Sequence, residues 1–364
     1  MRIGKKDIRV DTLDPLIIAE VGVNYYDIAA KEGVPLMEAA KRMLREAHLG
    51  GADAVKFQTY KSAKIAARDS PAYWDTTKET TRSQFELFQK FDHFGEAEYR
   101  ELAEYAACIG ATFFSTPFDL EAVDFLDPLV PAFKVASADI TNLPLLERVA
   151  AKRKPILLAV GASSLEEIRR ALGVIRGGSP EAEVILLHCI LNYPTLPPNA
   201  NLGMIQGLRE EFPDLPIGYS DHVEPSADML EVTMAVLLGA CVIEKHVTLD
   251  KSLPGNDHYH AMDPVDLRKL KGQIERCRVL YGRRDKVVIE TEAPATRFAR
   301  RSIVLARAIR AGEALRAEDL IMKRPATGIP PTELDRVIGR RIVRDLPEDE
   351  ILQWEHLAPE GAGG

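Results

Sequence analysis

Long apolar runs are missing from this sequence, and its first ten residues are charged rather than apolar. A membrane-spanning helix needs about 18 apolar residues in succession, and an export signal needs an apolar segment behind a positive start. We therefore expect a cytoplasmic protein that makes no use of a membrane.

Cysteine is scarce, and positive charge is not in excess. The four cysteines are far apart and show no CxxC spacing, which argues against a zinc knuckle or a disulfide framework and fits a reducing cytosol. The formal net charge of -8 argues against the concentrated basic surface that nucleic acids require. We expect no nucleic-acid partner, and any anionic substrate must be met by a local cluster of positive charge.

Low-complexity segments are also absent, and 46% hydrophobic with 28% charged residues is the composition of a globular protein. At 364 residues the chain exceeds the roughly 250–300 residues at which a single core stops growing, so we expect two domains. We assign residues 1–282 to a large domain, 283–297 to a linker, 298–358 to a small mostly-β domain and 359–364 to a disordered tail.

Short apolar runs rich in β-forming residues alternate with amphipathic helical stretches between residues 16 and 281. This rhythm is typical of βαβ units. The predicted strands are residues 16–21, 54–58, 112–115, 132–136, 156–160, 184–187, 216–219 and 242–245. Eight strand–helix repeats predict an α/β fold, the (β/α)₈ TIM barrel. A polar segment at 59–83 interrupts the spacing and predicts a lid or binding loop.

Polar side chains end most of the predicted strands, and a barrel of this kind assembles its active site at those ends. They are Glu20, Lys56, Gln58, Ser115, Thr116, Lys134, Ser137, His188, Ser220, His222, Glu244 and His246. Lys56 and Lys134 lie within apolar runs, where an uncompensated ammonium group is expensive. A ligand with a phosphate and a carboxylate would compensate both. The alternative is that each lysine reaches water along apolar surface.

Two of these histidines predict a metal site. His222 and His246 end neighbouring predicted strands, with Asp221, Glu244 and the loop 255–258 nearby. Imidazole nitrogens, with water and substrate oxygens in the open positions, suit manganese or another divalent ion. The alternative is a structural role for both histidines.

Seven motifs occur in order along the chain. They are IIAEVGVN at residues 17–24, DAVKFQTY at 53–60, FFSTPFD at 113–119, FKVASAD at 133–139, GYSDH at 218–222, IEKHVT at 243–248 and PGNDH at 254–258. Together they resemble the sialic acid synthase family. The segment IRAGEALRAEDLIMKRPATGI, residues 309–329, resembles the antifreeze-like (SAF) domain that follows the barrel in that family. The resemblance extends over nearly the whole chain.

The resemblance implies a metal-dependent condensation of phosphoenolpyruvate with the open-chain aldehyde of N-acetylmannosamine or a related amino sugar. The products would be a nine-carbon 2-keto acid and phosphate. His222 and His246 would hold the metal, with manganese preferred and magnesium or cobalt as alternatives. Phosphoenolpyruvate would contact Lys56, Thr116, Lys134, Ser137 and Ser220, while Gln58, Tyr193 and Asp257 would face the sugar.

The resemblance also implies a domain-swapped homodimer. The SAF domain of one chain would cap its partner's barrel, so that Arg324 reaches the other subunit's sugar. The condensation needs acid/base carboxylates, for which Glu20 and Asp139 are the candidates, while Lys56 and Lys134 neutralise phosphoenolpyruvate. The division of labour between the two carboxyl groups stays open at this point.

Several positions depart from the family pattern. AVGA at 159–162 stands where STGM is usual, Ile190 and Leu191 replace a Thr-Asn pair, and HYH at 258–260 replaces His-Lys-Ala. The segment 70–80 has no clear equivalent of the family's sugar-binding asparagine. Because these changes lie at the predicted barrel mouth, they bear on the sugar more than on the reaction class.

Two other functions fit some of the same residues. A Schiff-base aldolase on this fold would use Lys134 or Lys56 as its nucleophile and would need no metal. A carbohydrate-binding protein would use the small domain and keep the barrel as a scaffold. We favour the synthase, because two lysines and two histidines exceed what a Schiff base requires and a scaffold leaves the polar strand ends without a purpose.

Overall fold

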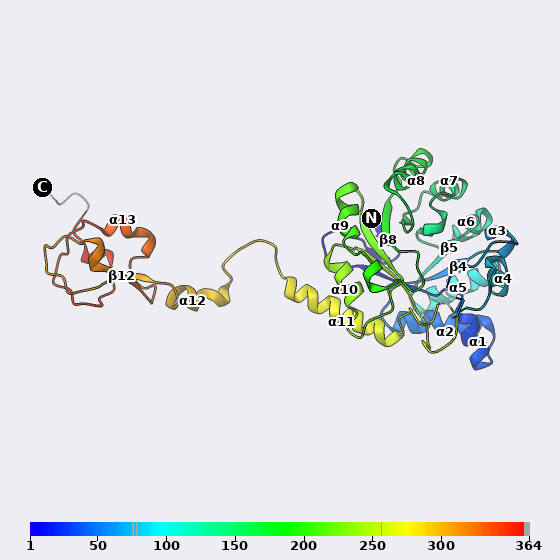
Figure 1. Ribbon diagram of the computed structural model, residues 1–364, viewed down its shortest axis with the longest axis horizontal. Helices are drawn as coiled ribbons and strands as arrows, with labels where there is room; N and C mark the ends of the chain where they lie inside the picture. Colours follow the sequence, from blue (N-terminus) through cyan, green and yellow to red (C-terminus); the bar gives the residue numbers. More distant parts are fainter. Residues whose placement is uncertain (75, 78, 256, 360–364) are drawn as a thin grey trace. The chain divides into compact units, whose positions relative to one another are not determined.

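The computed structural model describes residues 1–74, 76–77, 79–255 and 257–359. The chain divides into two compact units, Met1–Gly282 and Arg283–Gly364 (Figure 1). Of the expected tail at 359–364, all but the first residue lies outside the described residues. No helix in the described ranges is both long enough and apolar enough to cross a membrane.

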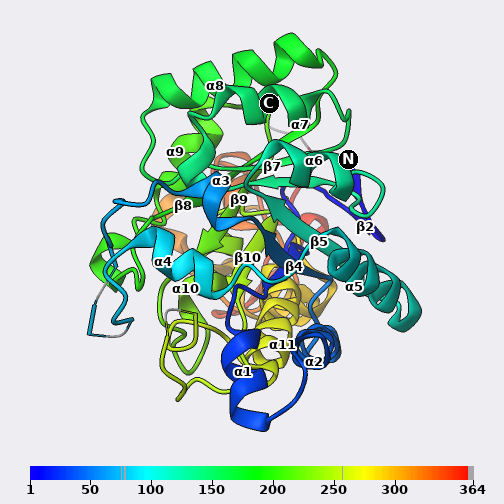
Figure 2. The ribbon, with the colours of Figure 1, turned by 90° about the vertical axis from the view of Figure 1, so that its right-hand side faces the viewer.

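Eight parallel strands form the main sheet of the first unit. They are β3 (Leu16–Glu20), β4 (Ala54–Thr59), β5 (Thr112–Pro117), β6 (Phe133–Val135), β7 (Ile156–Ala159), β8 (Val184–Cys189), β9 (Ile217–Asp221) and β10 (Val242–His246). In the described chain, hydrogen-bonded ladders join every neighbouring pair except β5 and β6, so the barrel is nearly closed (Figure 2). The predicted TIM barrel is confirmed.

Helices follow the strands and enclose the sheet (Figure 2). They are α1 (Tyr25–Glu32), α2 (Leu36–Leu49), α3 (Ser62–Ile65), α4 (Gln84–Lys90), α5 (Glu96–Ile109), α6 (Leu120–Leu126), α7 (Leu143–Ala150), α8 (Leu165–Gly178), α9 (Met204–Glu211), α10 (Leu230–Leu237) and α11 (Pro264–Tyr281). The local sequence determines where two of these helices begin. Ser164 and Glu167 form a capping box before α8, and Asp263 caps α11 directly before its first residue, a proline.

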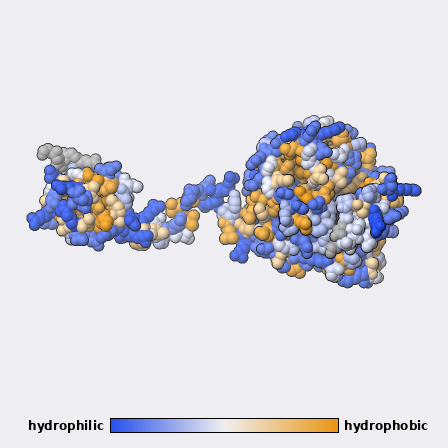
Figure 3. Space-filling view, viewed as in Figure 1, coloured by the Kyte–Doolittle hydropathy of each residue, from blue (hydrophilic) through white to orange (hydrophobic). Residues whose placement is uncertain are grey.

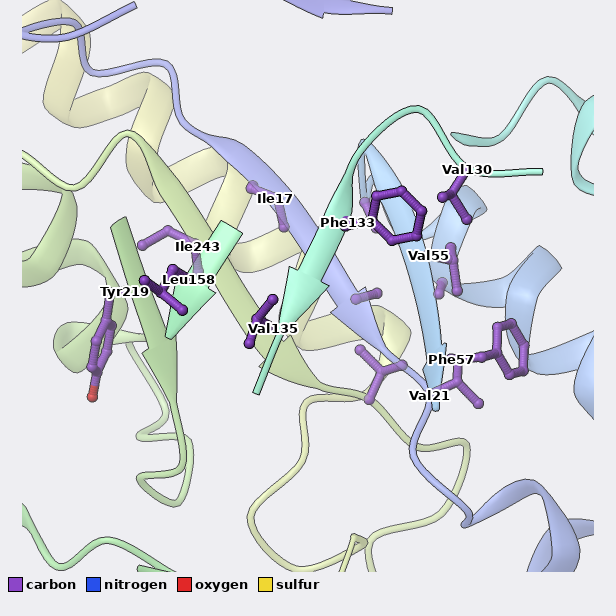
Figure 4. Close-up of a cluster of buried hydrophobic side chains, with 14 of the residues drawn as sticks. Ile17, Val21, Val55, Phe57, Val130, Phe133, Val135, Leu158, Tyr219 and Ile243 are labelled. Atoms are coloured by element: carbon purple, nitrogen blue, oxygen red, sulfur yellow. The ribbon is translucent and has the colours of Figure 1, made fainter. Parts of the chain in front are cut away.

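Alternate strand residues belong to two different buried clusters, because successive side chains of a strand point to opposite faces. Outward-pointing residues such as Phe57 pack beneath the helices (Figure 4). Inward-pointing residues such as Ala54 and Ala132 fill the base of the barrel. Lys56 and Lys134 each follow one of these alanines by two residues, so they point into the barrel interior above its apolar base.

The second unit is small and has its own core. Its strands β11 (Ser302–Leu305) and β12 (Leu320–Lys323) pair antiparallel, and its helices are α12 (Ala293–Phe298) and α13 (Leu334–Val337). Ten buried apolar residues, from Ile303 to Leu357, form the core. Residues 290–298, which we assigned mainly to a linker, are helical. On the face drawn in Figure 3, hydrophilic residues cover much of this unit and of the barrel unit.

Candidate active site

A cavity of about 370 Å³ opens at the carboxyl ends of the barrel strands. Each of the eight strands contributes at least one lining residue: Glu20, Lys56, Gln58, Thr116, Lys134, Ala159, Cys189, Ser220, Glu244 and His246. The long segment between β4 and α5 adds further residues, among them Tyr73 and Phe88. Ten of the twelve polar strand-end residues predicted from the sequence therefore share one cavity.

The base of the cavity holds two buried lysines and two buried glutamates. Lys56 Nζ lies 2.8 Å from Glu20 Oε1 and 3.8 Å from Glu244 Oε2. Lys134 Nζ lies 3.2 Å from the other oxygen of Glu244. Because all four residues are at most 6% exposed, each charge depends on the others for compensation. The partners of the buried lysines thus include carboxylates of this chain, which the sequence analysis did not consider.

The charges of this cluster shift the pKa of its members. Burial raises the pKa of Glu20, but the charge of Lys56, followed by other nearby cations, outweighs burial and holds that pKa well below its usual range. Burial lowers the pKa of Lys134, yet the nearby glutamates raise it above its ordinary value. Burial raises the pKa of Asp139, and a hydrogen bond from Asn142 offsets only part of that effect. Glu20 is therefore ionised, whereas Asp139 keeps its proton to higher pH.

Three hydroxyl groups line the same cavity, and two of them bind the charged cluster. Thr116 Oγ1 accepts a hydrogen bond from Lys56 Nζ at 2.9 Å, and Ser220 Oγ donates to Glu244 Oε1 at 2.9 Å. Ser137 Oγ accepts from the backbone N–H of Gly161 at 2.9 Å. All three hydroxyl-bearing residues line the cavity, so the predicted anion-binding residues are brought together with the two lysines.

The two predicted metal ligands lie beside each other. The ring centroids of His222 and His246 are 5.6 Å apart. His222 Nδ1 donates to the carbonyl oxygen of Ile190 at 2.8 Å, which leaves Nε2 with its lone pair. This is the arrangement that orients a ligating imidazole in metal sites.

A second set of ligand atoms converges on His246. One atom each from His246, Asp257 and His260 lies within 4.8 Å of the others. Within the described ranges, His246 Nδ1 and both ring nitrogens of His260 are buried without a hydrogen-bond partner. Burial, followed by the charges of neighbouring histidines, lowers the pKa of His260 well below its usual range, so that its ring is neutral. Neutral imidazoles and a carboxylate fit a divalent ion.

Three polar strand-end residues do not line the cavity. Ser115 is buried, and its Oγ lies 2.5 Å from Thr59 Oγ1. Asp221, which we grouped with the metal site, points outward: its carboxylate binds Lys245 Nζ at 2.7 Å and accepts from the Tyr219 hydroxyl at 2.7 Å. His188 is buried, donates from Nε2 to the carbonyl of Ala200 and stacks on Tyr219. Asp221 directly precedes His222 in the chain, and successive strand residues face opposite sides.

Family models match both units of the chain. The model described as the NeuB family matches residues 43–286, and the model described as the SAF domain matches residues 300–358. The first match alone spans more than half of the chain. The chain belongs to the NeuB family. The resemblance read from the sequence motifs is thereby confirmed, including the antifreeze-like domain.

Relatives of this NeuB-family chain match it over nearly their full length. The N,N'-diacetyllegionaminic acid synthase of Legionella pneumophila is 37% identical over 96% of both chains. The N-acetylneuraminate-9-phosphate synthase of Mus musculus is 32% identical over 94% of this chain and 92% of its own. The solved structure of the N-acetylneuraminic acid synthetase of Leptospira borgpetersenii has a TM-score of 0.67 at 31% identity, covering 81% of this chain and 94% of that one.

As a member of the NeuB family, the chain is an enzyme. It is a synthase that condenses phosphoenolpyruvate with an N-acetylated sugar to give a nonulosonic acid. Enzymes of this family use a divalent metal, and the histidine and aspartate groups described above fit one.

The predicted sugar-binding residues of this NeuB-family enzyme lie in two places. Gln58, Tyr193 and Asp257 line the cavity, with the Tyr193 ring 4.3 Å from that of His222. Gln58 Nε2 donates to Glu20 Oε1 at 2.8 Å. Arg324 belongs to the second unit, directly after β12, and its role stays a prediction.

The sequence did not predict the contacts of two residues at the site. Glu244 was predicted as a strand-end residue and placed near the metal, whereas in the structure it joins both lysines. Its position two residues before His246, on the same face of β10, is the signal that could have shown this. His260 was noted only as a departure from the family pattern. Nothing in its local sequence shows that it reaches His246.

Proposed function

We propose that this enzyme condenses phosphoenolpyruvate with a six-carbon sugar that carries two acetamido groups, giving a product of the N,N'-diacetyllegionaminic acid type. The main observation in support is that aromatic and aliphatic side chains form the outer wall of the cavity. They are Tyr60, Ile65, Tyr73, Trp74, Leu87, Phe88, Phe91, Phe118 and Leu191. Such a wall favours acetamido methyl groups and deoxygenated carbons over hydroxyl groups. The legionaminic relatives of Legionella pneumophila and Campylobacter jejuni, at 37% and 36% identity, support this choice.

A phosphorylated sugar fits the same wall poorly. Among the described lining residues, the lysines are Lys56 and Lys134, and both lie at the buried base within the glutamate cluster. A sugar phosphate would need a cation further out, because buried or partly buried phosphate is bound by lysine or arginine. This supports an unphosphorylated acceptor.

For phosphoenolpyruvate, we assign the base of the cavity. Lys56 and Lys134 would bind its carboxylate and phosphate, with the hydroxyl groups of Thr116, Ser137 and Ser220 as neutral hydrogen-bond partners. The backbone N–H of Gly161, directed at Ser137 Oγ, orients that hydroxyl. Both lysines can exchange part of their pairing with glutamate for pairing with the substrate.

His222 and His246, with Asp257 beside them, would hold the divalent ion, for which manganese is our first choice. Its chemistry, when bound, is to polarise the aldehyde oxygen of the sugar. The enol carbon of phosphoenolpyruvate then forms the new carbon–carbon bond, and the oxygen of the former aldehyde takes a proton. Asp139 is our donor for that proton, because burial raises its pKa.

Water then attacks the cationic carbon that carries the phosphate ester. Glu20 is our acceptor for the proton of that water, because the charge of Lys56 and other cations keeps it ionised despite burial. The carbon–oxygen bond to phosphate then breaks while the new hydroxyl group passes its remaining proton to the departing phosphate, which leaves the 2-keto group and inorganic phosphate. Glu20 and Asp139 thus take opposite roles.

A Schiff-base mechanism is disfavoured by the same electrostatics. A lysine nucleophile must be neutral, which requires a lowered pKa. Burial lowers the pKa of Lys134, but Glu244 and Glu20 raise it beyond the ordinary value. Borohydride with a carbonyl substrate should therefore trap no covalent adduct on this residue.

The deciding experiment supplies phosphoenolpyruvate, Mn²⁺ and a panel of sugars, and follows phosphate release. The panel contains N-acetylmannosamine, its 6-phosphate and a 2,4-diacetamido-trideoxy hexose. We expect the highest kcat/KM with the diacetamido sugar and loss of turnover with a chelator. Phosphate release with N-acetylmannosamine alone would overturn the sugar assignment, and release with no member would overturn the amino-sugar function.

For the assembly, we propose a homodimer in the cytoplasm. The supporting observation is that the small unit has a thin core of ten residues and carries Arg324 on its own surface segment. Such a unit has a clear purpose if it completes the sugar site of a partner chain. The four cysteines are unpaired, which suits a reducing compartment.

A further inference from the structure

His260 is a fully buried histidine whose ring has no hydrogen-bond partner among the described residues. Its side chain is 0% exposed, and both Nδ1 and Nε2 are unpaired. Leaving a buried polar atom unpaired costs about 1–3 kcal/mol, so two on one ring need an explanation. A ligand that accepts a nitrogen lone pair is the simplest explanation.

The fold holds His260 beside the metal-binding residues. After β10 the chain loops out and returns, and Met262 N donates to the carbonyl of His246 at 2.8 Å while Thr248 N donates to the carbonyl of Met262 at 2.8 Å. These bonds fix the base of the loop, so a residue two positions before Met262 must lie over the end of β10. The rings of His260 and His246 are accordingly 4.9 Å apart between centroids.

The other histidine of this loop, His258, has a partner for each of its ring nitrogens. His258 is equally buried, but its Nδ1 lies 2.7 Å from Thr248 Oγ1 and its Nε2 lies 3.2 Å from Asp27 Oδ2. Both of its nitrogens are therefore used in holding the loop. Of the two loop histidines, His260 alone keeps its nitrogens available in the part of the chain that the structure describes.

Asp257 is seated against the same two histidines. A Cβ on Gly22 would lie 2.0 Å from Asp257 Oδ2, so the glycine is what admits this carboxylate. Val23 N donates to the same oxygen at 3.3 Å, and Asp257 Oδ1 lies 3.5 Å from His246 Nδ1. The carboxylate is thus held in place by backbone and is directed at the histidines.

We propose that His260 is a further protein ligand of the divalent metal ion, which it binds together with His246 and the carboxylate of Asp257. The ligand atoms of these three residues lie within 4.8 Å of one another. Ligands at about 2.1 Å from an ion lie up to about 4.2 Å apart, so only a small closure is needed. The proposal rests on the proposed function only in that the enzyme uses a metal.

The added imidazole changes which ions the site prefers. Imidazole suits iron, nickel, copper and zinc, whereas carboxylate and water suit magnesium and manganese, and cobalt lies between iron and nickel in affinity. A site with His260 therefore binds Co²⁺ more tightly than a site with His222 and His246 alone, and discriminates more strongly against Mg²⁺. This is a property of the chain itself and is independent of the sugar.

The test measures metal binding without substrates. Metal-free full-length protein is titrated with Co²⁺, and both the visible absorption of the bound ion and competition with a chelator are followed. We compare the wild type with His260→Ala and with His260→Gln, which keeps the size of the side chain. His48→Ala is the matched control, because His48 also has an unpaired buried ring nitrogen but lies on α2, away from the cavity lining.

We expect the Kd for Co²⁺ to rise roughly tenfold or more in both His260 variants, with an altered absorption spectrum and no change in the control. Thermal unfolding of the metal-free proteins shows whether each variant is folded. A folded His260→Gln protein with the Kd and spectrum of the wild type would overturn the proposal. Because neither phosphoenolpyruvate nor a sugar is present, failure here leaves the proposed reaction intact. Failure of the sugar panel likewise leaves this result standing.

Discussion

Lys56 and Lys134 are the side chains whose burial most needs an explanation at the scale of single residues. An ammonium group in the interior is tolerated when a carboxylate and further hydrogen bonds compensate it. Glu244 supplies this for both lysines, with Glu20 as the second carboxylate of Lys56. The cluster holds its members in place without substrate, and under our proposal phosphoenolpyruvate takes over part of the compensation.

Replacing Glu244 by glutamine should therefore destabilise the protein. Two buried lysines would lose a carboxylate, and we expect the free energy of unfolding to fall by about 2–3 kcal/mol, as measured by urea denaturation without substrate. Phosphoenolpyruvate should restore more stability to Glu244→Gln than it adds to the wild type. Glu104→Gln, at an exposed position of α5, is the control and should change little. Equal stabilisation of wild type and variant by phosphoenolpyruvate would argue against the assigned anion site.

The opposite roles of the two acid/base carboxyl groups predict a pH effect. As a proton donor, Asp139 works below its pKa, so kcat should fall as pH rises through that pKa. Burial raises this pKa and the Asn142 hydrogen bond lowers it in part. Asn142→Ala should therefore raise the pKa further and move the alkaline limb of the kcat profile to higher pH.

Asp139→Asn should remove that limb and lower kcat by about 10²- to 10⁴-fold, with a small effect on the KM for phosphoenolpyruvate. A kcat profile that stays in place in Asn142→Ala would show that Asp139 is not the proton donor. Glu20 would then have to act both as the proton donor and as the proton acceptor.

The sequence predicted most single residues of the site because strand periodicity is a local property. Once Lys56, Gln58 and His246 were placed near strand ends, the alternation of side chains brought them to one interior. The prediction that Asp221 lies near the metal was wrong, because its side chain points to the opposite face of β9, where it pairs with Lys245. The position of His260 beside His246 could not be predicted, because it depends on the hydrogen bonds that return the loop to β10.

At the scale of elements, the segment between β4 and α5 matters most. We predicted a lid or binding loop at 59–83, and the structure shows the short helix α3 within it and the short helix α4 directly after it. Aromatic residues between β4 and α5, among them Tyr73 and Phe88, line the cavity. Two residues of this segment, 75 and 78, lie outside the described ranges. The segment therefore forms the outer wall against which we place the sugar.

Tyr73 tests the function of this wall. It is 61% exposed and lines the cavity, so its replacement should not unfold the barrel. We expect Tyr73→Ala to raise the KM for the sugar by about tenfold and to leave the KM for phosphoenolpyruvate nearly unchanged. Tyr281→Ala, an exposed aromatic at the end of α11, is the matched control. Equal effects on both substrates would contradict the placement of the sugar.

The strands were predictable as elements because each is a short apolar run bounded by turn signals. The helices of the outer wall were not, because α3 and α4 have only four and seven residues and lack a sustained apolar period. Residues 290–298 were assigned largely to the linker for the same reason. Their helical turns begin at local caps and at Pro294 rather than from an amphipathic pattern.

At the scale of the whole molecule, the chain consists of two units with separate cores. The described residues that line the cavity all belong to the barrel unit. If Arg324 acts in the sugar site, it completes either the barrel of its own chain or the barrel of a partner chain. Mixing two inactive variants distinguishes these possibilities.

One variant carries Arg324→Ala with an intact barrel, and the other carries Asp139→Asn with an intact small unit. In a domain-swapped dimer, the intact barrel of the first variant meets the intact small unit of the second, so one site of each mixed dimer is restored. Random pairing after joint refolding makes half of the dimers mixed, so about a quarter of the wild-type turnover should return. If Arg324 serves its own barrel, every site keeps a defect and no turnover returns. Recovery therefore requires both the dimer and the exchange of units, which neither variant alone can report.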